Sequence, residues 1–118
     1  MTKFIVEFYE DVNGNRPVEN FLLKQDVKIR AKLLGLLEIL QEKGNQLREP
    51  YSKYLGNGIF ELRGKQGSNL SRILYFFYCD GKIILTNGFV KKTQKTPVNE
   101  LKLAQNRRND YLERKHEK

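Results

Sequence analysis

The strongest constraint on the fold is a change in the spacing of apolar residues about halfway along the chain. Between residues 17 and 40 the apolar residues recur every three or four positions, which is the spacing of one face of an α-helix. From residue 58 to residue 90 the period changes to two, and aromatic and branched side chains are frequent, as is typical of β-strands. Helices and strands therefore occupy separate segments, and an α+β fold is predicted.

Three helices are predicted from this spacing. The first begins at Pro17, whose fixed φ angle suits the first turn of a helix. The second has the strongest helical pattern and ends at Gly44; its apolar face consists of Ile29, Leu33, Leu36, Leu37 and Leu40. The third begins at Pro97 with Thr96 as its N-cap, and its apolar side consists of Val98, Leu101, Ala104 and Tyr111.

The predicted strands give the order of the elements. They cover residues 3–9, 58–63, 70–78 and 82–90, and residues 44–56 are predicted to form a loop. The expected order is β-α-α-β-β-β-α, a mainly antiparallel sheet packed by two N-terminal helices and a C-terminal helix. A length of 118 residues suits one domain over residues 1–118, with a frayed tail at 113–118.

Several kinds of chemistry and location are disfavoured by composition. One cysteine, Cys79, cannot form an intramolecular disulfide, which favours a reducing compartment. No window approaches the apolar length of a signal peptide core or a membrane helix, so a cytoplasmic location is predicted. His116 is the only histidine, so a histidine-based nucleophile relay or a metal site lacks its parts, and no cofactor is expected.

The excess positive charge lies in the second half of the chain. Residues 1–52 contain 8 basic and 8 acidic residues, whereas residues 53–118 contain 14 basic and 6 acidic residues and so carry the whole net charge of +8. Concentrated Lys and Arg commonly bind phosphate backbones, because each contact releases a condensed counterion. A polyanion-binding surface is therefore predicted here, and a merely soluble basic surface is the alternative.

A short turn sets the register of the last two predicted strands. Asp80-Gly81 tolerates the positive φ angles of a type I′ turn and predicts a two-residue hairpin loop. The resulting cross-strand pairs are Tyr78 with Ile83, Phe76 with Leu85, Leu74 with Asn87, and Arg72 with Phe89. Since opposed residues share a face, Arg72, Phe89 and Lys91 are expected on one side at the open end of the hairpin.

The preceding hairpin brings two more charged residues to this face. If residues 64–69 close it so that Arg63 opposes Leu70, then Glu61 falls opposite Arg72 and Arg63 joins the group. A slip of one residue would send Glu61 and Arg63 to the other face.

This group of side chains suits a phosphate. We expect a single exposed pocket formed by Arg63, Arg72 and Lys91 around Glu61 and Phe89, with Lys92 and Lys95 just beyond. Arginine offers forked donors for phosphate oxygens, Phe89 a ring for stacking an unpaired base, and Glu61 a carboxylate that orients an arginine. The alternative is an Arg–Glu pair that only fixes strand register, with Phe89 in the core. Spacing alone does not decide between them.

Two stretches of the second half resemble a known toxin superfamily. The resemblance is carried by KYLGNGIFELR (53–63) and SRILYFFYCDGKIILTNGFVKKTQKTPVNELKLA (71–104), and it is most specific over residues 60–104. These stretches are similar to the RelE/ParE toxins, particularly the phage-derived HigB-like branch. The compact fold of that superfamily agrees with the predicted order of elements.

The resemblance implies a type II toxin-antitoxin toxin that cuts mRNA in the ribosomal A site and inhibits translation. Such an mRNA interferase is an endoribonuclease in which the ribose 2′-OH attacks the adjacent phosphate, with no metal. The resemblance implies catalytic roles for Arg63, Arg72, Lys91 and Lys92. Together with the residue pattern it points to RNA contacts by Phe89, Lys53, Tyr54 and Lys95. The general base is left unassigned.

The resemblance also implies a partner and leaves other functions open. A HigA-like helix-turn-helix antitoxin would block the toxin, and the complex would bind operator DNA. A ParE-like toxin that poisons DNA gyrase without cutting RNA is one alternative, and a non-toxic phage-derived module that binds RNA or protein is another. The joint presence of Arg63, Arg72 and Lys91 favours cleavage.

Overall fold

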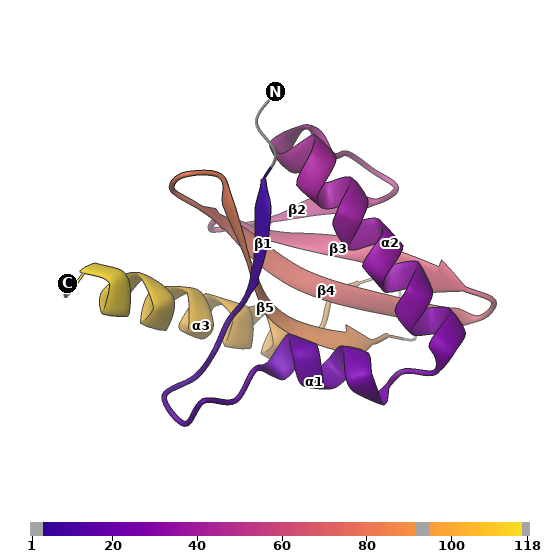
Figure 1. The fold of residues 1–118 in the computed structure, drawn as a ribbon, viewed down its shortest axis with the longest axis horizontal. Helices are drawn as coiled ribbons and strands as arrows, with labels where there is room; N and C mark the ends of the chain where they lie inside the picture. The colour runs from indigo at the N-terminus through magenta and orange to yellow at the C-terminus, as the bar shows by residue number, and fades with distance from the viewer. Residues whose placement is uncertain (1–3, 92–94, 117–118) are drawn as a thin grey trace.

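Five strands form one sheet, and helices cover both of its faces (Figure 1). The computed structural model describes residues 4–91 and 95–116. The elements are β1 (Ile5–Phe8), α1 (Pro17–Lys24), α2 (Val27–Lys43), a 3₁₀ turn (Gly44–Gln46), β2 (Ser52–Gly56), β3 (Ile59–Gln66), β4 (Asn69–Tyr78), β5 (Lys82–Val90) and α3 (Val98–His116). The predicted α+β fold is confirmed.

The sheet has the strand order β1-β5-β4-β3-β2. β1 runs parallel to β5, and the other neighbouring pairs are antiparallel. The first strand of the chain thus lies beside the last one, at the edge of the sheet (Figure 1).

Two apolar cores separate the helices from the sheet. On one face, α1 and α2 pack against alternate residues of the central strands; this core includes Leu33, Leu40, Leu62, Ile73 and Leu85. On the other face, α3 packs on the intervening residues, among them Leu74, Phe76, Ile84, Phe89 and Ala104. Because side chains alternate along a strand, the position of a residue in β3, β4 or β5 fixes which helices it faces.

The helices follow the sequence signals closely at their starts. α1 begins at Pro17, and Asp26 caps α2 by accepting a hydrogen bond from the amide of Ile29 at 3.0 Å. α2 ends at Gly44, whose φ of +54° and contact with the Phe4 ring leave no room for a Cβ atom.

Two of the outer segments differ from the prediction. Residues 52–56 form the edge strand β2 rather than part of a loop. The hydroxyl of Thr96, the predicted cap of α3, donates to Glu61 instead, and Val98 is 61% exposed rather than on the apolar side of the helix. At the tail, α3 extends as far as His116, and Arg114 bonds to Asp110 at 2.6 Å; residues 117–118 lie outside the described residues.

The register between β4 and β5 is partly as predicted. Tyr78 pairs with Lys82, so the turn has three residues and the predicted pairs near it, Tyr78 with Ile83 and Phe76 with Leu85, are wrong. A bulge at Thr86 then restores the predicted register, and Leu74 pairs with Asn87 and Arg72 with Phe89. One extra residue in the turn is compensated by one extra residue in the strand.

The register between β3 and β4 differs from the prediction by two residues. Arg63 pairs with Arg72 rather than Leu70, and Glu61 pairs with Leu74 rather than Arg72. A shift of two residues preserves the face on which every side chain lies, whereas a shift of one would reverse it. The predicted face of Glu61 and Arg63 is therefore correct.

None of the helices within residues 4–91 and 95–116 has the length and apolar character needed to span a membrane.

Candidate functional site

The predicted charged residues meet on the α3 side of the sheet, around the carboxylate of Glu61. Glu61 and Arg63 lie two residues apart on β3, and Arg72 lies opposite Arg63 on β4. Lys91 follows β5 directly, and its amide donates to the carbonyl of Leu70 at 2.9 Å, which extends the pairing beyond the end of the strand. We call Glu61, Arg63, Arg72 and Lys91 the Glu61 cluster.

Glu61 binds its neighbours through both carboxylate oxygens. Oε1 accepts a hydrogen bond from Arg63 Nε at 3.1 Å and lies 3.6 Å from Arg72 Nε. Oε2 accepts from the Thr96 hydroxyl at 2.6 Å and lies 3.8 Å from Lys91 Nζ. The carboxylate thus joins β3, β4, the end of β5 and the segment that leads into α3.

Most of the charged side chains of the Glu61 cluster are buried, and removing charges from water costs free energy. The side chains of Glu61, Lys91 and Arg72 are 0%, 1% and 6% exposed, and that of Arg63 is 21% exposed. Burial lowers the pKa of Arg72 below its ordinary value, against the attraction of Glu61. Burial also lowers the pKa of Lys91, and the nearby arginines add to this effect. Three cations therefore surround one buried carboxylate, and Arg63 also lies 3.8 Å from the exposed carboxylate of Glu49.

The expected exposed pocket is not what Arg72 and Lys91 form. Their side chains converge as predicted, but they do so inside the protein on Glu61. Phe89 is 9% exposed and belongs to the core beneath α3, so it presents no open ring face. This arrangement matches the alternative in which an Arg–Glu pair fixes the strands, and sequence spacing could not reveal it because the cover supplied by α3 is a long-range contact.

The other predicted site residues divide between the two faces. Lys53 pairs with Glu61 across β2 and β3 and is exposed on the cluster side. Tyr54 pairs with Phe60 on the opposite face, where its ring lies 4.8 Å from that of Phe60. Lys95 is exposed and adjoins Thr96, which binds Glu61. Lys92 lies outside the described residues.

A cavity gives the Glu61 cluster its access to solvent. It has a volume of about 380 Å³ and lies where β2 stops short of the end of β3. Its lining residues are Lys32, Leu36, Pro50, Tyr51, Arg63, Gly64, Lys65, Leu70 and Arg72. Four of them are cationic and none is acidic. Lys32 and Tyr51 were not predicted to lie here, because α2 and residues 50–51 reach this edge only through the tertiary fold. Lys65 was not predicted because the predicted strand ended at residue 63, whereas β3 continues to Gln66.

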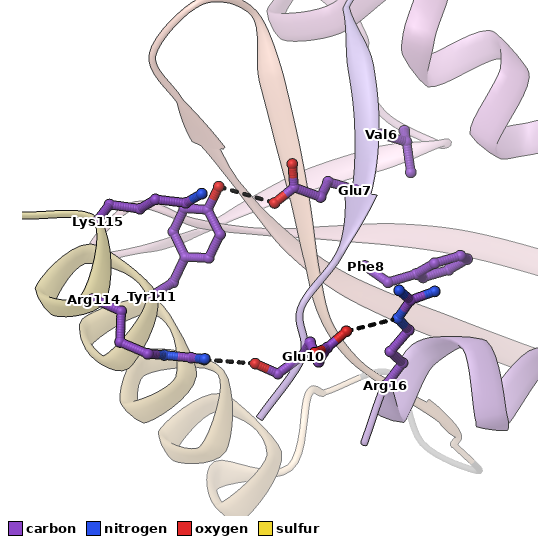
Figure 2. Close-up of a pocket in the computed structure, with 8 residues that line it drawn as sticks. All are labelled: Val6, Glu7, Phe8, Glu10, Arg16, Tyr111, Arg114 and Lys115. Atoms are coloured by element: carbon purple, nitrogen blue, oxygen red, sulfur yellow. Dashed lines mark hydrogen bonds and ion pairs between the residues drawn. The ribbon is translucent and has the colours of Figure 1, made fainter. Parts of the chain in front are cut away.

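A second cleft, of about 560 Å³, lies between β1 and α3 and holds none of the predicted site residues (Figure 2). The Tyr111 hydroxyl donates to Glu7 at 3.0 Å, and burial together with this carboxylate raises the pKa of Tyr111. Arg16 binds Glu10 at 3.0 Å, and Arg114 binds the Glu10 carbonyl. Both arginines of this cleft thus have acidic or carbonyl partners, and Lys115 Nζ lies 5.3 Å from the centre of the Tyr111 ring.

No group of three potential metal ligands from His, Cys, Asp and Glu occurs in the part of the chain that the structure describes. The chemistry available at the Glu61 cluster is thus that of guanidinium, ammonium and carboxylate groups. Such groups bind and polarise a phosphate and exchange protons with it.

The protein is thus a small basic α+β protein with a cluster of cations on one face of its sheet. The family model for Phage derived protein Gp49-like (DUF891) matches residues 20–109, and the chain belongs to this family. The Gp49-like family is part of the RelE/HigB-like toxin group, whose members pair with helix-turn-helix antitoxins. Among curated proteins no match was found.

Proposed function

We propose that the protein is the toxin of a type II toxin-antitoxin system and cleaves mRNA on the ribosome. The observation that carries the proposal is that Arg63 and Arg72 both contact Glu61 and also line one cavity without an acidic residue. A phosphate in this cavity would meet two guanidinium groups whose positions are already fixed. Membership of the Gp49-like family supports the same function.

The proposed reaction is an internal transfer of the phosphoryl group. The ribose 2′-OH loses its proton and its oxygen attacks the adjacent phosphorus, while the bond from phosphorus to the 5′-oxygen breaks and that oxygen takes up a proton. The products are a 2′,3′-cyclic phosphate and a 5′-OH end. No electrons are exchanged with an outside group, and the two proton transfers balance.

Each residue of the Glu61 cluster has a proposed role. Arg72 and Arg63 stabilise the negative charge that develops on the phosphoryl oxygens, and Glu61 holds both arginines in place. Lys91 moves a proton, which a lowered pKa favours at neutral pH. Lys92, which the described residues do not include, is the second candidate for this role. Lys53 and Lys95 contact the RNA backbone from the exposed rim.

The proposed partners follow from the family. A HigA-like helix-turn-helix antitoxin would neutralise the protein in the cytoplasm, and the complex would bind operator DNA. The ribosomal A site would present the mRNA.

The proposal is tested by mapping mRNA ends after induction of the protein in growing cells. We expect new 5′-OH ends within translated regions, and none when translation initiation is blocked. Growth arrest with an intact transcript pool would refute the proposal.

A second candidate function rests on the burial of Arg72 and Lys91. Cations held inside the protein by Glu61 stabilise a binding surface without acting on RNA, as in a ParE-like toxin that poisons DNA gyrase. A supercoiling assay with purified gyrase separates the two functions, since an mRNA endonuclease leaves gyrase active.

A further inference from the structure

We propose that the cavity beside Arg63 and Arg72 is a subsite for one unpaired RNA base, with Tyr51 as the ring on which the base stacks. This inference rests on the proposed RNA substrate, and it names the part of the RNA that the cavity holds. The sequence pattern predicted this stacking role for Phe89, but the Phe89 ring is buried.

The position of Tyr51 is fixed although its side chain is 48% exposed. Its carbonyl accepts a hydrogen bond from the amide of Arg63 at 2.8 Å, and its own amide donates to the carbonyl of Arg48 at 3.0 Å. The next residue, Ser52, is buried and shares a 2.6 Å hydrogen bond with the hydroxyl of Tyr75. An exposed ring on a held backbone is a suitable stacking surface, because little conformational freedom is lost on binding.

The lining of the cavity suits a base attached to a phosphate. Leu36, Pro50 and Leu70 provide apolar surface beside the Tyr51 ring, and Lys32 and Lys65 are exposed cations at the rim. A cavity of about 380 Å³ is of the size that ligand sites have. Four of the lining residues are cationic and none is acidic, although Glu61 pairs with Arg63 and Arg72 from outside the lining, so the lining favours an anionic ligand.

One of the residues that line the cavity, Arg72, has a donor without a hydrogen bond. Arg72 lines the cavity and is 5% exposed, and among the described residues its buried Nε makes no hydrogen bond. The nearest acceptor, Glu61 Oε1, lies 3.6 Å away and is already bonded to Arg63. A buried N–H without a partner is costly, and a phosphate oxygen next to the stacked base would satisfy it.

The test measures how the full-length protein binds a short single-stranded RNA that carries 2-aminopurine, a base whose fluorescence reports stacking. We expect Tyr51→Leu to weaken binding about tenfold or more and to abolish the fluorescence change, because stacking contributes about 1–3 kcal/mol per base. Tyr51→Phe keeps the ring and is expected to bind within about twofold of wild type, since the π-face remains.

Two further variants keep the test decisive. Tyr54→Leu removes the other half-exposed tyrosine, which was predicted from sequence to contact RNA but packs on Phe60 on the opposite face and does not line the cavity. An equal loss of binding in this variant would overturn the assignment to Tyr51. Lys65→Gln leaves the ring in place and is expected to reduce the salt dependence of binding by about one phosphate contact. An unchanged salt dependence would remove Lys65 from the subsite.

The outcome separates this inference from the proposed function. If wild type and Tyr51→Leu cleave mRNA equally well in a translation extract and bind the RNA probe equally, the subsite is refuted while the endonuclease stands. If wild type cleaves nothing but its binding of the probe depends on Tyr51, the subsite stands and the endonuclease is refuted.

Discussion

The Glu61 cluster and the cleft between β1 and α3 both contain ion pairs, but they balance charge differently. In the cleft, Arg16 is matched by Glu10 (Figure 2). Arg114 is matched by Asp110, and these four side chains are between 34% and 49% exposed. In the Glu61 cluster three cations share one carboxylate that is fully buried. Exposed, matched pairs cost the fold little, whereas a buried excess of cations is expensive.

This difference is consistent with the proposed role of the Glu61 cluster as a ligand site. A buried cation excess stabilises the fold less than apolar packing of the same volume would, so packing alone does not account for it. An anion that enters beside Arg63 and Arg72 would restore the balance. The following four predictions test this contrast, from the largest expected effect to the smallest.

Glu61→Gln is expected to cause the largest change. It preserves the shape of the side chain but leaves three buried or half-buried cations without their shared anion, and the free energy of unfolding should fall by about 3–5 kcal/mol. Urea denaturation measures the loss. Glu10→Gln in the cleft is the matched control and should shift the midpoint far less. Equal midpoints for the two variants would contradict the contrast.

Arg72→Ala is expected to reduce the rate of RNA cleavage by about 10²–10³-fold, the usual cost of removing one group that stabilises transition-state charge. Primer extension on a translated message measures the rate. Arg16→Ala removes an arginine from the cleft and should leave cleavage unchanged. Unimpaired cleavage by Arg72→Ala would show that the cluster is structural only.

Lys91 is expected to make stability depend on pH in the alkaline range. Because its pKa is lowered in the folded protein, the unfolded chain binds this proton more tightly between that lowered pKa and the ordinary value of 10.5. The free energy of unfolding of wild type relative to Lys91→Met should therefore rise with pH across this window. Urea titrations of both proteins at a series of pH values test the sign, and parallel curves would refute it.

Arg16→Gln is expected to have the smallest effect. The Arg16 side chain is 49% exposed, so solvent screens its pair with Glu10. Its denaturation midpoint should match that of wild type at moderate salt. A clear loss of stability would show that the cleft depends on its ion pairs after all.

The sequence predicted on which face of the sheet the site residues lie, but it did not predict that they are buried. Period-two alternation assigned Glu61, Arg63 and Arg72 to one face, and this assignment survived errors in both hairpin registers. It survived because the β3–β4 error was an even number of residues and the bulge at Thr86 corrected the other. A local sequence pattern therefore predicts which face of the sheet a strand residue occupies better than it predicts how many residues a turn contains.

The missed features depend on contacts between distant segments. β2 (Ser52–Gly56) is a short edge strand, and its neighbouring residues Lys53 and Tyr54 are both exposed, so it lacks the apolar alternation by which a strand is predicted. Thr96 looks like a helix cap in sequence, yet its hydroxyl binds Glu61, 35 residues away. The burial of Arg72 and Lys91 and the place of Tyr51 in the cavity lining likewise depend on how distant segments pack.

The parallel pairing of β1 with β5 has a consequence for the life of the nascent chain. Ile5 pairs with Lys82, so the strand that is synthesised first stays unpaired until more than two thirds of the protein has been made. Thr96, whose hydroxyl donates to the carboxylate of Glu61, is synthesised later still. A chain whose synthesis stops before Thr96 therefore lacks the completed cluster on which the proposed activity would depend.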